Sequence, residues 1–356
     1  MRRSFVLLPA VIFFFSSFAY GRGSFVYGRS PESDTAKLSC LQKADSLLDE
    51  ALSFMKKNYY LRDFIQWDDL TKRAKMRLME AGNCEDAYET IGWCFRQLNE
   101  HHSFVMPPAK AASYNYDASS LQPPPPLKDL VGEIKGEWLS DSIAYLTIPW
   151  VSTTDSLVCM NIADSLQALI ARLDTRKISR WIIDLRKNSG GNCWPMLAGI
   201  GPLLGDGVCG YFVASEQKIP ISYRNGAAFQ GKHVLCRVSR EGYRTQCSRN
   251  SVIVLTGRKT VSAGEIVALA FKGKEQAWLF GEPTAGFTTA NATYSLSDHS
   301  MLVLTVCQEA DHMGRICQGS IVPDKLIPLP ANNPVIGNAV AEDSVRSAAV
   351  SWLRTQ

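Results

Sequence analysis

The 356-residue sequence lacks the features of several large protein classes. It contains only 25 Gly and 17 Pro, with 46% hydrophobic residues, which excludes collagen-like repeats and an intrinsically disordered chain. The net charge is only +4, and no run of Lys and Arg marks a face for nucleic acid, so we expect no nucleic-acid binding. No internal repeat is present. The remaining composition is that of a globular chain with ample apolar surface for a core.

Cysteine motifs for metal or redox chemistry are also missing. None of the ten Cys residues belongs to a Cys-x-x-Cys pair, which argues against zinc and thioredoxin-like sites. The even number is typical of an oxidising compartment. Cys236 and Cys247 lie almost symmetrically about an expected turn, as do Cys307 and Cys317, so we predict a disulfide bond in each pair. Buried free thiols are the alternative.

No apolar run is long enough to suggest a membrane span. Residues 1–20 combine Arg2 and Arg3 with an apolar run of about 14 residues, whereas a span needs roughly 20. This pattern is typical of a cleaved signal peptide; a membrane anchor is the alternative. No Cys lies at the expected cleavage site, so a lipoprotein signature is absent. We expect export to the periplasm or the extracellular space, without stable membrane insertion.

Signal cleavage is directly testable. N-terminal sequencing of the exported protein is expected to find a first residue between Tyr20 and Arg22, because small residues end the apolar run just before this point. Membrane-embedded protein that still begins with Met1 would contradict this prediction.

Three further segments differ in their patterns. Apolar residues at helical spacing predict a small helical N-terminal domain over residues 32–106. A Pro-rich linker follows over 107–126 and ends in four consecutive prolines, so neither helix nor central strand is expected there. From 127 to 356, short buried strands alternate with amphipathic helices, which predicts an α/β domain with a largely buried sheet.

Two adjacent glycines follow one of the predicted buried strands. Gly190 and Gly191 end the segment Asp184-Leu185-Arg186-Lys187-Asn188-Ser189-Gly190-Gly191. Without a Cβ, their backbone N–H groups can approach a ligand closely and stabilise an oxyanion. Taken alone, the segment is better explained by a tight turn. No Lys-Ser or Lys-Thr follows, so it is not a P-loop.

Ser262 lies where a predicted strand meets a predicted helix, in Thr260-Val261-Ser262-Ala263-Gly264-Glu265. Serine is a preferred N-cap residue, which alone would account for it. The position also suits a nucleophile, because the Ala263 N–H and the positive helix end would face developing negative charge.

His101 and His102 end the last N-terminal helix. Either could act as a general base, or could merely interact with the helix C-terminus as a partial cation. Two adjacent histidines cannot share one helical face, and no third ligand is spaced for zinc. We therefore expect no metal site.

Together, these segments resemble the C-terminal processing and tricorn-core serine peptidases. The residues that carry the resemblance are Asp184-Leu185-Arg186-x-Asn188-x-Gly190-Gly191, Ser262-Ala263-Gly264-Glu265, Gly281-Glu282-Pro283-Thr284-Ala285-Gly286 and Val322-Pro323-Asp324. In addition, Leu98-Asn99-Glu100-His101-His102-Ser103 resembles the Leu-x-Asp-Gly-His-Ser motif of the tricorn-like branch. The resemblance covers about residues 36–330. It implies an α/β, crotonase-like (ClpP/crotonase) core preceded by a small helical N-terminal domain.

The resemblance also implies roles for individual residues. Ser262 would be the nucleophile, and backbone N–H groups of Ala263, Gly190 and Gly191 would form the oxyanion hole. The processing branch activates its serine with a lysine 25 positions later, but here that position is Phe287. The tricorn-like branch uses a histidine, and His102 occupies its place in the motif.

Two features of the family are missing from this sequence. The tricorn-like branch has a supporting glutamate shortly before its Pro-Asp motif, whereas this chain has Cys317-Gln318-Gly319-Ser320 there. The candidates for that role are Gln318, Glu309 and Asp311. The linker is also too short for the PDZ domain that many processing proteases contain.

The sequence therefore predicts an exported serine endopeptidase that cleaves polypeptides and needs neither cofactor nor metal. The alternative is a catalytically silent relative that binds peptides or hydrophobic ligands in the same cleft. The missing glutamate and His101, which replaces the usual glycine, favour that alternative. Crotonase-type acyl chemistry is disfavoured, because no pattern for binding coenzyme A is present.

Overall fold

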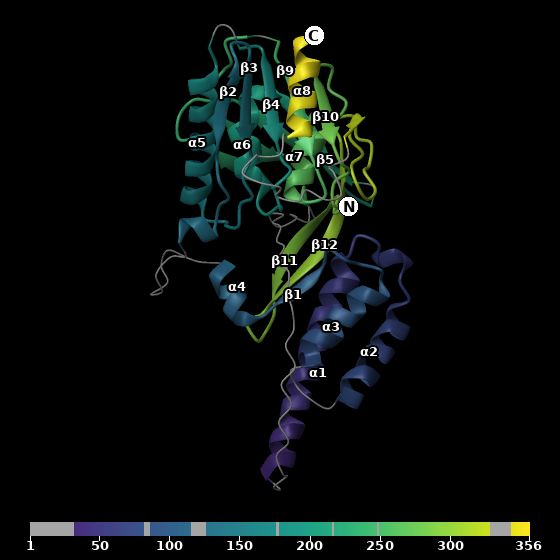
Figure 1. Cartoon of the computed structure of the whole chain (residues 1–356). Helices are drawn as coiled ribbons and strands as arrows, with labels where there is room; N and C mark the ends of the chain where they lie inside the picture. The colour runs from purple at the N-terminus through teal and green to yellow at the C-terminus, as the bar shows by residue number, and fades with distance from the viewer. Residues whose placement is uncertain are drawn as a thin grey trace, which may run out of the picture. The chain divides into compact units, whose positions relative to one another are not determined.

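The computed structural model describes residues 32–81, 86–114, 126–175, 178–215, 217–247, 249–327 and 343–356. The predicted signal peptide and most of the Pro-rich linker lie outside these residues. The chain divides into two compact units (Figure 1). The first contains the described residues up to 114 together with 291–307, and the second contains the described residues of 126–290 and 308–356.

The first unit is mainly helical, as the sequence predicts. Its elements are α1 (Glu32–Asn58), η1 (Arg62–Phe64), α2 (Trp67–Ala81), α3 (Asp86–Gln97), β1 (Phe104–Met106) and α4 (Pro108–Tyr114). Apolar residues at helical spacing bury one face of each long helix, for example Leu70, Ala74 and Leu78 of α2. β1 pairs antiparallel with the first residues of β12 (Met301–Ala310).

Helix α4 corrects one expectation. The sequence predicts that residues 107–126 contain no helix, yet α4 begins at Pro108 and extends to Tyr114. Proline is favoured in the first helical turn, where its missing N–H has no intrahelical acceptor and its fixed φ suits the helix. The prediction was wrong because it treated every proline as a helix breaker.

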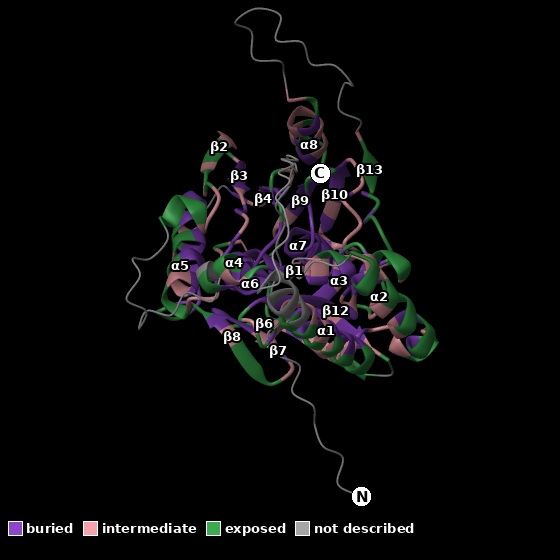
Figure 2. Cartoon of the chain, turned by 90° about the horizontal axis from the view of Figure 1, so that it is seen from below, coloured by how far each residue is buried: buried purple, intermediate pink, exposed green. Residues whose placement is uncertain are grey.

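The second unit contains a six-stranded, largely parallel sheet with the strand order β13-β10-β9-β4-β3-β2 (Figure 2). The strands are β2 (Gly136–Ser140), β3 (Ile143–Thr147), β4 (Arg180–Asp184), β9 (Ser251–Thr256), β10 (Ala277–Gly281) and β13 (Lys325–Leu326). Only β2 pairs antiparallel with its neighbour. The apolar runs of β4 and β9 are buried almost throughout, because helices cover both faces of the sheet.

An antiparallel sheet follows in the same unit. Its strands are β5 (Gly207–Ala214), β6 (Gln217–Arg224), β7 (Ala227–Gln230) and β8 (His233–Arg237). The last residues of β12, Gln308–Ala310, pair with β5, and β11 (Thr289–Ser295) pairs with β12. The chain thus passes between the two units within β11 and β12.

Three helices of the second unit lie against its sheets. Helices α5 (Ser156–Leu173) and α7 (Ala263–Phe271) contact both sheets, and α6 (Cys193–Leu204) contacts strands β6, β7 and β8 of the antiparallel sheet. Helices α6 and α7 are buried on nearly every side (purple in Figure 2), as expected for helices between two layers. Among the described helices, α5 is long and apolar enough to cross a membrane by length and composition alone. It buries Leu166, Ile170 and other residues in the protein interior, as a core helix does.

Helix α8 (Ser344–Arg354) packs on the parallel sheet through Val345, Ala349 and Leu353. Its partners include Ile253 and Leu255 of β9. Because successive strand residues point to opposite faces, the alternate residues of β9 point away from α8. Helix α8 therefore covers the face of the parallel sheet on which Ile253 and Leu255 lie.

Both predicted disulfide bonds are absent, since Cys236 is not bonded to Cys247 and Cys307 is not bonded to Cys317. Cys40 in α1 is disulfide-bonded instead.

The physical reason lies in the path of the chain after each first cysteine. The described residues that follow β8, 238–247, form no return strand, because the Ser239 and Tyr243 N–H groups bond instead to Asp164 and Gln167 of α5. In the loop that follows β12, the Cys317 N–H donates to the Glu309 carbonyl. The backbone register therefore places Cys317 opposite Glu309 and not opposite Cys307.

Candidate active site

Ser262 lies at a strained strand-to-helix turn between β9 and α7. It is the N-cap residue of α7, and its backbone has φ 53° and ψ −112°. Such a positive φ costs a non-glycine residue about 1–3 kcal/mol and persists only where the surroundings impose it. Similar sharp turns present the nucleophile of α/β hydrolases. The residue is fully buried.

The buried Glu265 carboxylate holds this turn in place. Its Oε2 accepts hydrogen bonds from the N–H groups of Ser262 (2.7 Å) and Phe287 (2.9 Å). Its Oε1 accepts from the Gly286 N–H (2.8 Å) and the Thr284 hydroxyl (2.5 Å). Burial raises the pKa of Glu265, and these four hydrogen bonds oppose that shift.

No separate function is predicted for Glu265 from the sequence. The signal for its contact with Ser262 was the Ser-x-x-Glu spacing, which is typical of a capping box. Its contacts with the Thr284–Phe287 turn come from sequence-distant backbone and had no local signal.

Gly190 and Gly191 both adopt backbone angles that favour glycine, with φ 97° and φ 101°. A Cβ on Gly190 would lie 2.9 Å from the Val261 carbonyl oxygen and 3.2 Å from the Ser262 Cβ. A Cβ on Gly191 would overlap the Val151 carbonyl oxygen at 1.9 Å. The glycines are therefore required for close approach, and Gly190 lies directly against the Ser262 turn.

The backbone donors near Ser262 are not equivalent. The Gly190 N–H already donates to the Asn188 Oδ1 at 2.9 Å. Within the described part of the chain, no acceptor contacts the N–H of Gly191 or of Ala263. The parallel bridge beside Gly191 uses the Val151 and Asn192 N–H groups, so it leaves the Gly191 N–H unused. The N–H groups of Gly191 and Ala263 are thus the donors that an oxyanion could use.

His102 belongs to the first unit, on the segment between α3 and β1. Its backbone N–H donates to the Glu100 Oε1 at 2.7 Å, and its carbonyl accepts from the Asn291 side-chain amide at 2.9 Å. The residue is buried, and burial lowers the pKa of its imidazole to about 3.

The neighbouring His101 side chain differs from His102 in its exposure and its contacts. It is exposed, and its Nε2 lies 3.2 Å from the Asn99 Oδ1. The two adjacent histidines therefore occupy different environments, and only His102 is fixed inside its unit.

The three candidates for a supporting residue also separate clearly. Gln318 is exposed. Asp311 forms an ion pair with Arg315 (2.7 Å) and accepts the Met313 N–H, so it serves the local turn. Glu309 is fully buried, and neither of its carboxyl oxygens has a hydrogen-bond partner among the described residues. Burial, together with the nearby charge of Glu265, raises the pKa of Glu309 well above its usual range.

The lysines that follow Ser262 in sequence are occupied elsewhere. The Lys272 Nζ contacts Asp324 and donates to the Val322 carbonyl (3.0 Å). The Lys274 Nζ donates to the Leu204 carbonyl (2.8 Å), at the C-terminus of α6. Within the described ranges, no three His, Cys, Asp or Glu side chains gather as a metal site requires.

Comparison with known proteins identifies the family. The model of peptidase family S41 matches residues 142–327, which is more than half of the chain. The chain is 27% identical over 316 residues to a nisin-resistance protein of Lactococcus lactis subsp. lactis, covering 86% of each protein. It is 28% identical over 212 residues to the chloroplastic carboxyl-terminal-processing peptidase 2 of Arabidopsis thaliana, which covers 59% of this chain but only 36% of that protein.

Solved structures agree on the fold. A lipoprotein from Streptococcus agalactiae superposes with a TM-score of 0.67 at 20% identity, covering 88% of this chain and 96% of that one. The photosystem II D1 C-terminal processing protease gives a TM-score of 0.53 at 16% identity, covering 81% and 95%. The predicted crotonase-like α/β core with a helical N-terminal region is thereby confirmed. The match over residues 142–327 shows that the chain belongs to peptidase family S41, a family of serine peptidases that hydrolyse peptide bonds.

Proposed function

We propose that the protein is an exported serine endopeptidase in which Ser262 is the nucleophile and His102 is its general base. The observation that carries this proposal is the Ser262 turn. A buried serine is held at φ 53° on a helix N-terminus, against Gly190 and beside the unused N–H of Ala263. The signal-peptide pattern of residues 1–20 supports export.

The proposed reaction has two halves. The Ser262 hydroxyl transfers its proton to the neutral imidazole of His102 as its oxygen attacks the carbonyl carbon of a peptide bond. The N–H groups of Ala263 and Gly191 stabilise the oxyanion. His102 then gives the proton to the departing amine, which leaves an ester on Ser262. Water hydrolyses this ester by the same route and restores the serine.

Burial supports His102 as the base. It keeps the imidazole uncharged at neutral pH, so that a ring nitrogen is free of the second proton and can accept one from serine. Phe287 stands where the processing branch has its lysine, and Lys272 and Lys274 are engaged at the far end of α7.

Glu309 is the supporting residue we propose in place of the family glutamate. Its raised pKa favours the neutral acid, which can donate a hydrogen bond rather than only accept one. Gln318 and Asp311 are assigned to the surface and to the 311–315 turn.

A catalytically silent peptide-binding protein is the second candidate, and the exposed His101 in place of the family glycine favours it. A fluorophosphonate probe separates the two. Under the proposed function, the probe forms a covalent adduct that peptide mapping locates on Ser262. A protein that stays unlabelled at Ser262 while still binding peptides would establish the silent relative.

Glu265→Gln tests whether the turn depends on the buried carboxylate. An amide has one acceptor oxygen instead of two, and its NH₂ would face backbone N–H groups that need an acceptor. We expect a loss of about 1–3 kcal/mol in the free energy of unfolding, and probe labelling of Ser262 at least tenfold slower. Urea unfolding and labelling rates measure both. The matched control is Glu275→Gln, at an exposed position just after α7, which should leave both unchanged. If the Glu265→Gln variant is labelled at Ser262 at the wild-type rate, the Glu265 carboxylate does not hold the turn in its reactive geometry.

A further inference from the structure

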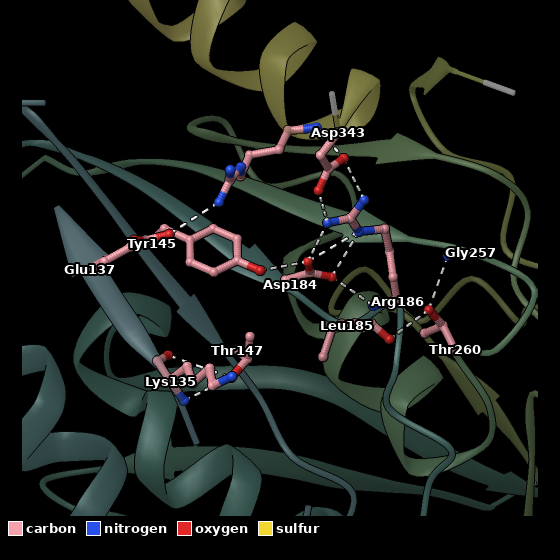
Figure 3. Close-up of polar contacts among 11 residues, drawn as sticks. Lys135, Glu137, Tyr145, Thr147, Asp184, Leu185, Arg186, Gly257, Thr260 and Asp343 are labelled. Carbon is pink, nitrogen blue, oxygen red and sulfur yellow. Dashed lines mark hydrogen bonds and ion pairs between the residues drawn. The ribbon is translucent and has the colours of Figure 1, made fainter. Parts of the chain in front are cut away.

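Arg186 joins the C-terminal helix to the segment that carries Gly190 and Gly191 (Figure 3). Its guanidinium donates to both Asp343 oxygens, at 2.7 Å and 2.6 Å. The same group contacts both Asp184 oxygens, at 3.0 Å, 3.1 Å and 2.5 Å. The Arg186 side chain is only 18% exposed. One guanidinium thus bridges two carboxylates that are separated by 159 residues of sequence.

Each carboxylate is fixed by further contacts. Asp184 ends β4 and accepts a hydrogen bond from the Tyr145 hydroxyl of β3 at 2.7 Å (Figure 3). Asp343 is the N-cap residue of α8 and accepts the Arg346 N–H at 3.1 Å. Arg186 therefore connects the carboxyl end of β4, which Tyr145 in the middle of β3 supports, with the first turn of the C-terminal helix.

The residue beside Arg186 continues this connection to the proposed nucleophile. The Leu185 carbonyl accepts hydrogen bonds from the Thr260 hydroxyl (2.9 Å) and the Asn188 N–H (2.9 Å). The Val261 N–H in turn donates to the Asn188 carbonyl at 3.0 Å. Thr260 is fully buried and lies two residues before Ser262. A shift of residues 184–188 would thus displace the Ser262 turn together with the glycines.

The pair is not needed merely to attach the helix. Helix α8 already buries Val345, Ala349 and Leu353 on the sheet, and a buried ion pair contributes little net stability once its desolvation cost is counted. A bidentate Arg–carboxylate pair does, however, fix the relative position and orientation of the two groups.

We infer that Arg186 and Asp343 are positioning residues, and that the docked α8 keeps the Gly190–Gly191 turn and the Ser262 turn in reactive geometry. This inference rests on the proposed function for its effect on catalysis. The contacts themselves lie wholly within the second unit. The C-terminal helix thereby contributes to the reaction without providing any of the proposed reacting groups.

Asp343→Asn is the test variant, because asparagine is as good an N-cap as aspartate and leaves α8 able to form. It removes the negative charge and one of the two acceptors for Arg186. We expect kcat to fall tenfold to a hundredfold with KM within twofold, because small misplacements of reacting groups cost rates of about this size. Amide hydrogen exchange in residues 184–192 and 257–264 should accelerate about tenfold. Arg186→Lys should have the same effects on kcat and on amide exchange, since an ammonium cannot form the bidentate hydrogen bonds of a guanidinium.

Two controls separate positioning from a general loss of stability. Asp155→Asn makes the same change at the N-cap of α5, where the carboxylate accepts the Val158 N–H. Ser351→Gly weakens α8 at an exposed position without touching Arg186. Both should keep wild-type kcat and wild-type exchange in the two segments.

The inference is overturned if Asp343→Asn keeps wild-type kcat and exchange, or if Ser351→Gly reproduces its effects. Wild-type protein that labels with no fluorophosphonate and cleaves no peptide would instead overturn the proposed function. The exchange measurement needs no turnover, so it would still decide whether α8 holds the two turns.

Discussion

Ser262→Ala is expected to abolish hydrolysis of a cleavable polypeptide and covalent labelling by a fluorophosphonate, while the protein stays folded. Removal of a nucleophile lowers kcat by several orders of magnitude. The fold loses only a hydroxyl. The hydrogen bonds that hold the turn come from the Ser262 backbone, whose N–H donates to Glu265 and whose carbonyl accepts the Ile266 N–H (3.0 Å). Alanine retains both.

The cost in stability should be that of a lost N-cap, about 0.5–2 kcal/mol, against a typical 5–15 kcal/mol for a folded domain. Urea unfolding and kcat/KM on the same preparation measure the two effects separately. The matched control is Ser251→Ala, at the other end of β9, where the hydroxyl contacts the Gln276 Oε1 at 3.2 Å. Wild-type turnover by Ser262→Ala would remove Ser262 from the mechanism.

The sequence predicted the parts of the fold that local patterns determine. The continuous apolar run Trp181-Ile182-Ile183 identified a strand buried on both faces. This strand is β4, the third strand from the β2 edge of the parallel sheet, and it pairs with β3 and β9. Local patterns selected Ser262 and the two glycines as candidates, because a strand-to-helix turn and a close backbone approach each demand particular residue types. Their proposed catalytic roles came from the resemblance to the peptidase family.

The antiparallel strands β5 to β8 had weaker signals. β6 (Gln217–Arg224), for example, buries only Ile221 and Tyr223 and includes Pro220, which argues against a central strand. The structure places Pro220 opposite Tyr211 in the β5–β6 pair. Such a position depends on tertiary pairing, which single-sequence propensities do not encode.

Long-range contacts of the site were beyond local reasoning altogether. Nothing in the spacing indicates that Arg186 meets Asp343, or that Glu265 meets Gly286, because both pairs depend on the complete sheet. The failed disulfide predictions have the same origin. Symmetry about a turn specifies a cross-strand pair only when the register is known.

His102→Ala is expected to lower kcat/KM by about 10²–10⁴-fold, the usual contribution of a general base. The fold should tolerate this change, because the hydrogen bonds of His102 to Glu100 and Asn291 come from its backbone. His101→Ala is the matched control at the adjacent position, where the side chain is exposed, and it should be nearly neutral. Equal or greater damage from His101→Ala would contradict the assignment.

The pH profile of the wild-type enzyme provides the decisive second readout for the base. Only the neutral imidazole accepts a proton, so kcat/KM rises with pH through the pKa of His102. An unperturbed histidine would place that midpoint near 6.5, as the sequence alone suggests, but burial lowers the pKa of His102 to about 3. The limb should therefore lie well below pH 6.5, with a plateau across neutral pH. A lysine base would give the opposite result, because its neutral form accumulates only as pH rises toward about 10. A profile that still climbs above pH 8 would therefore exclude His102 as the base.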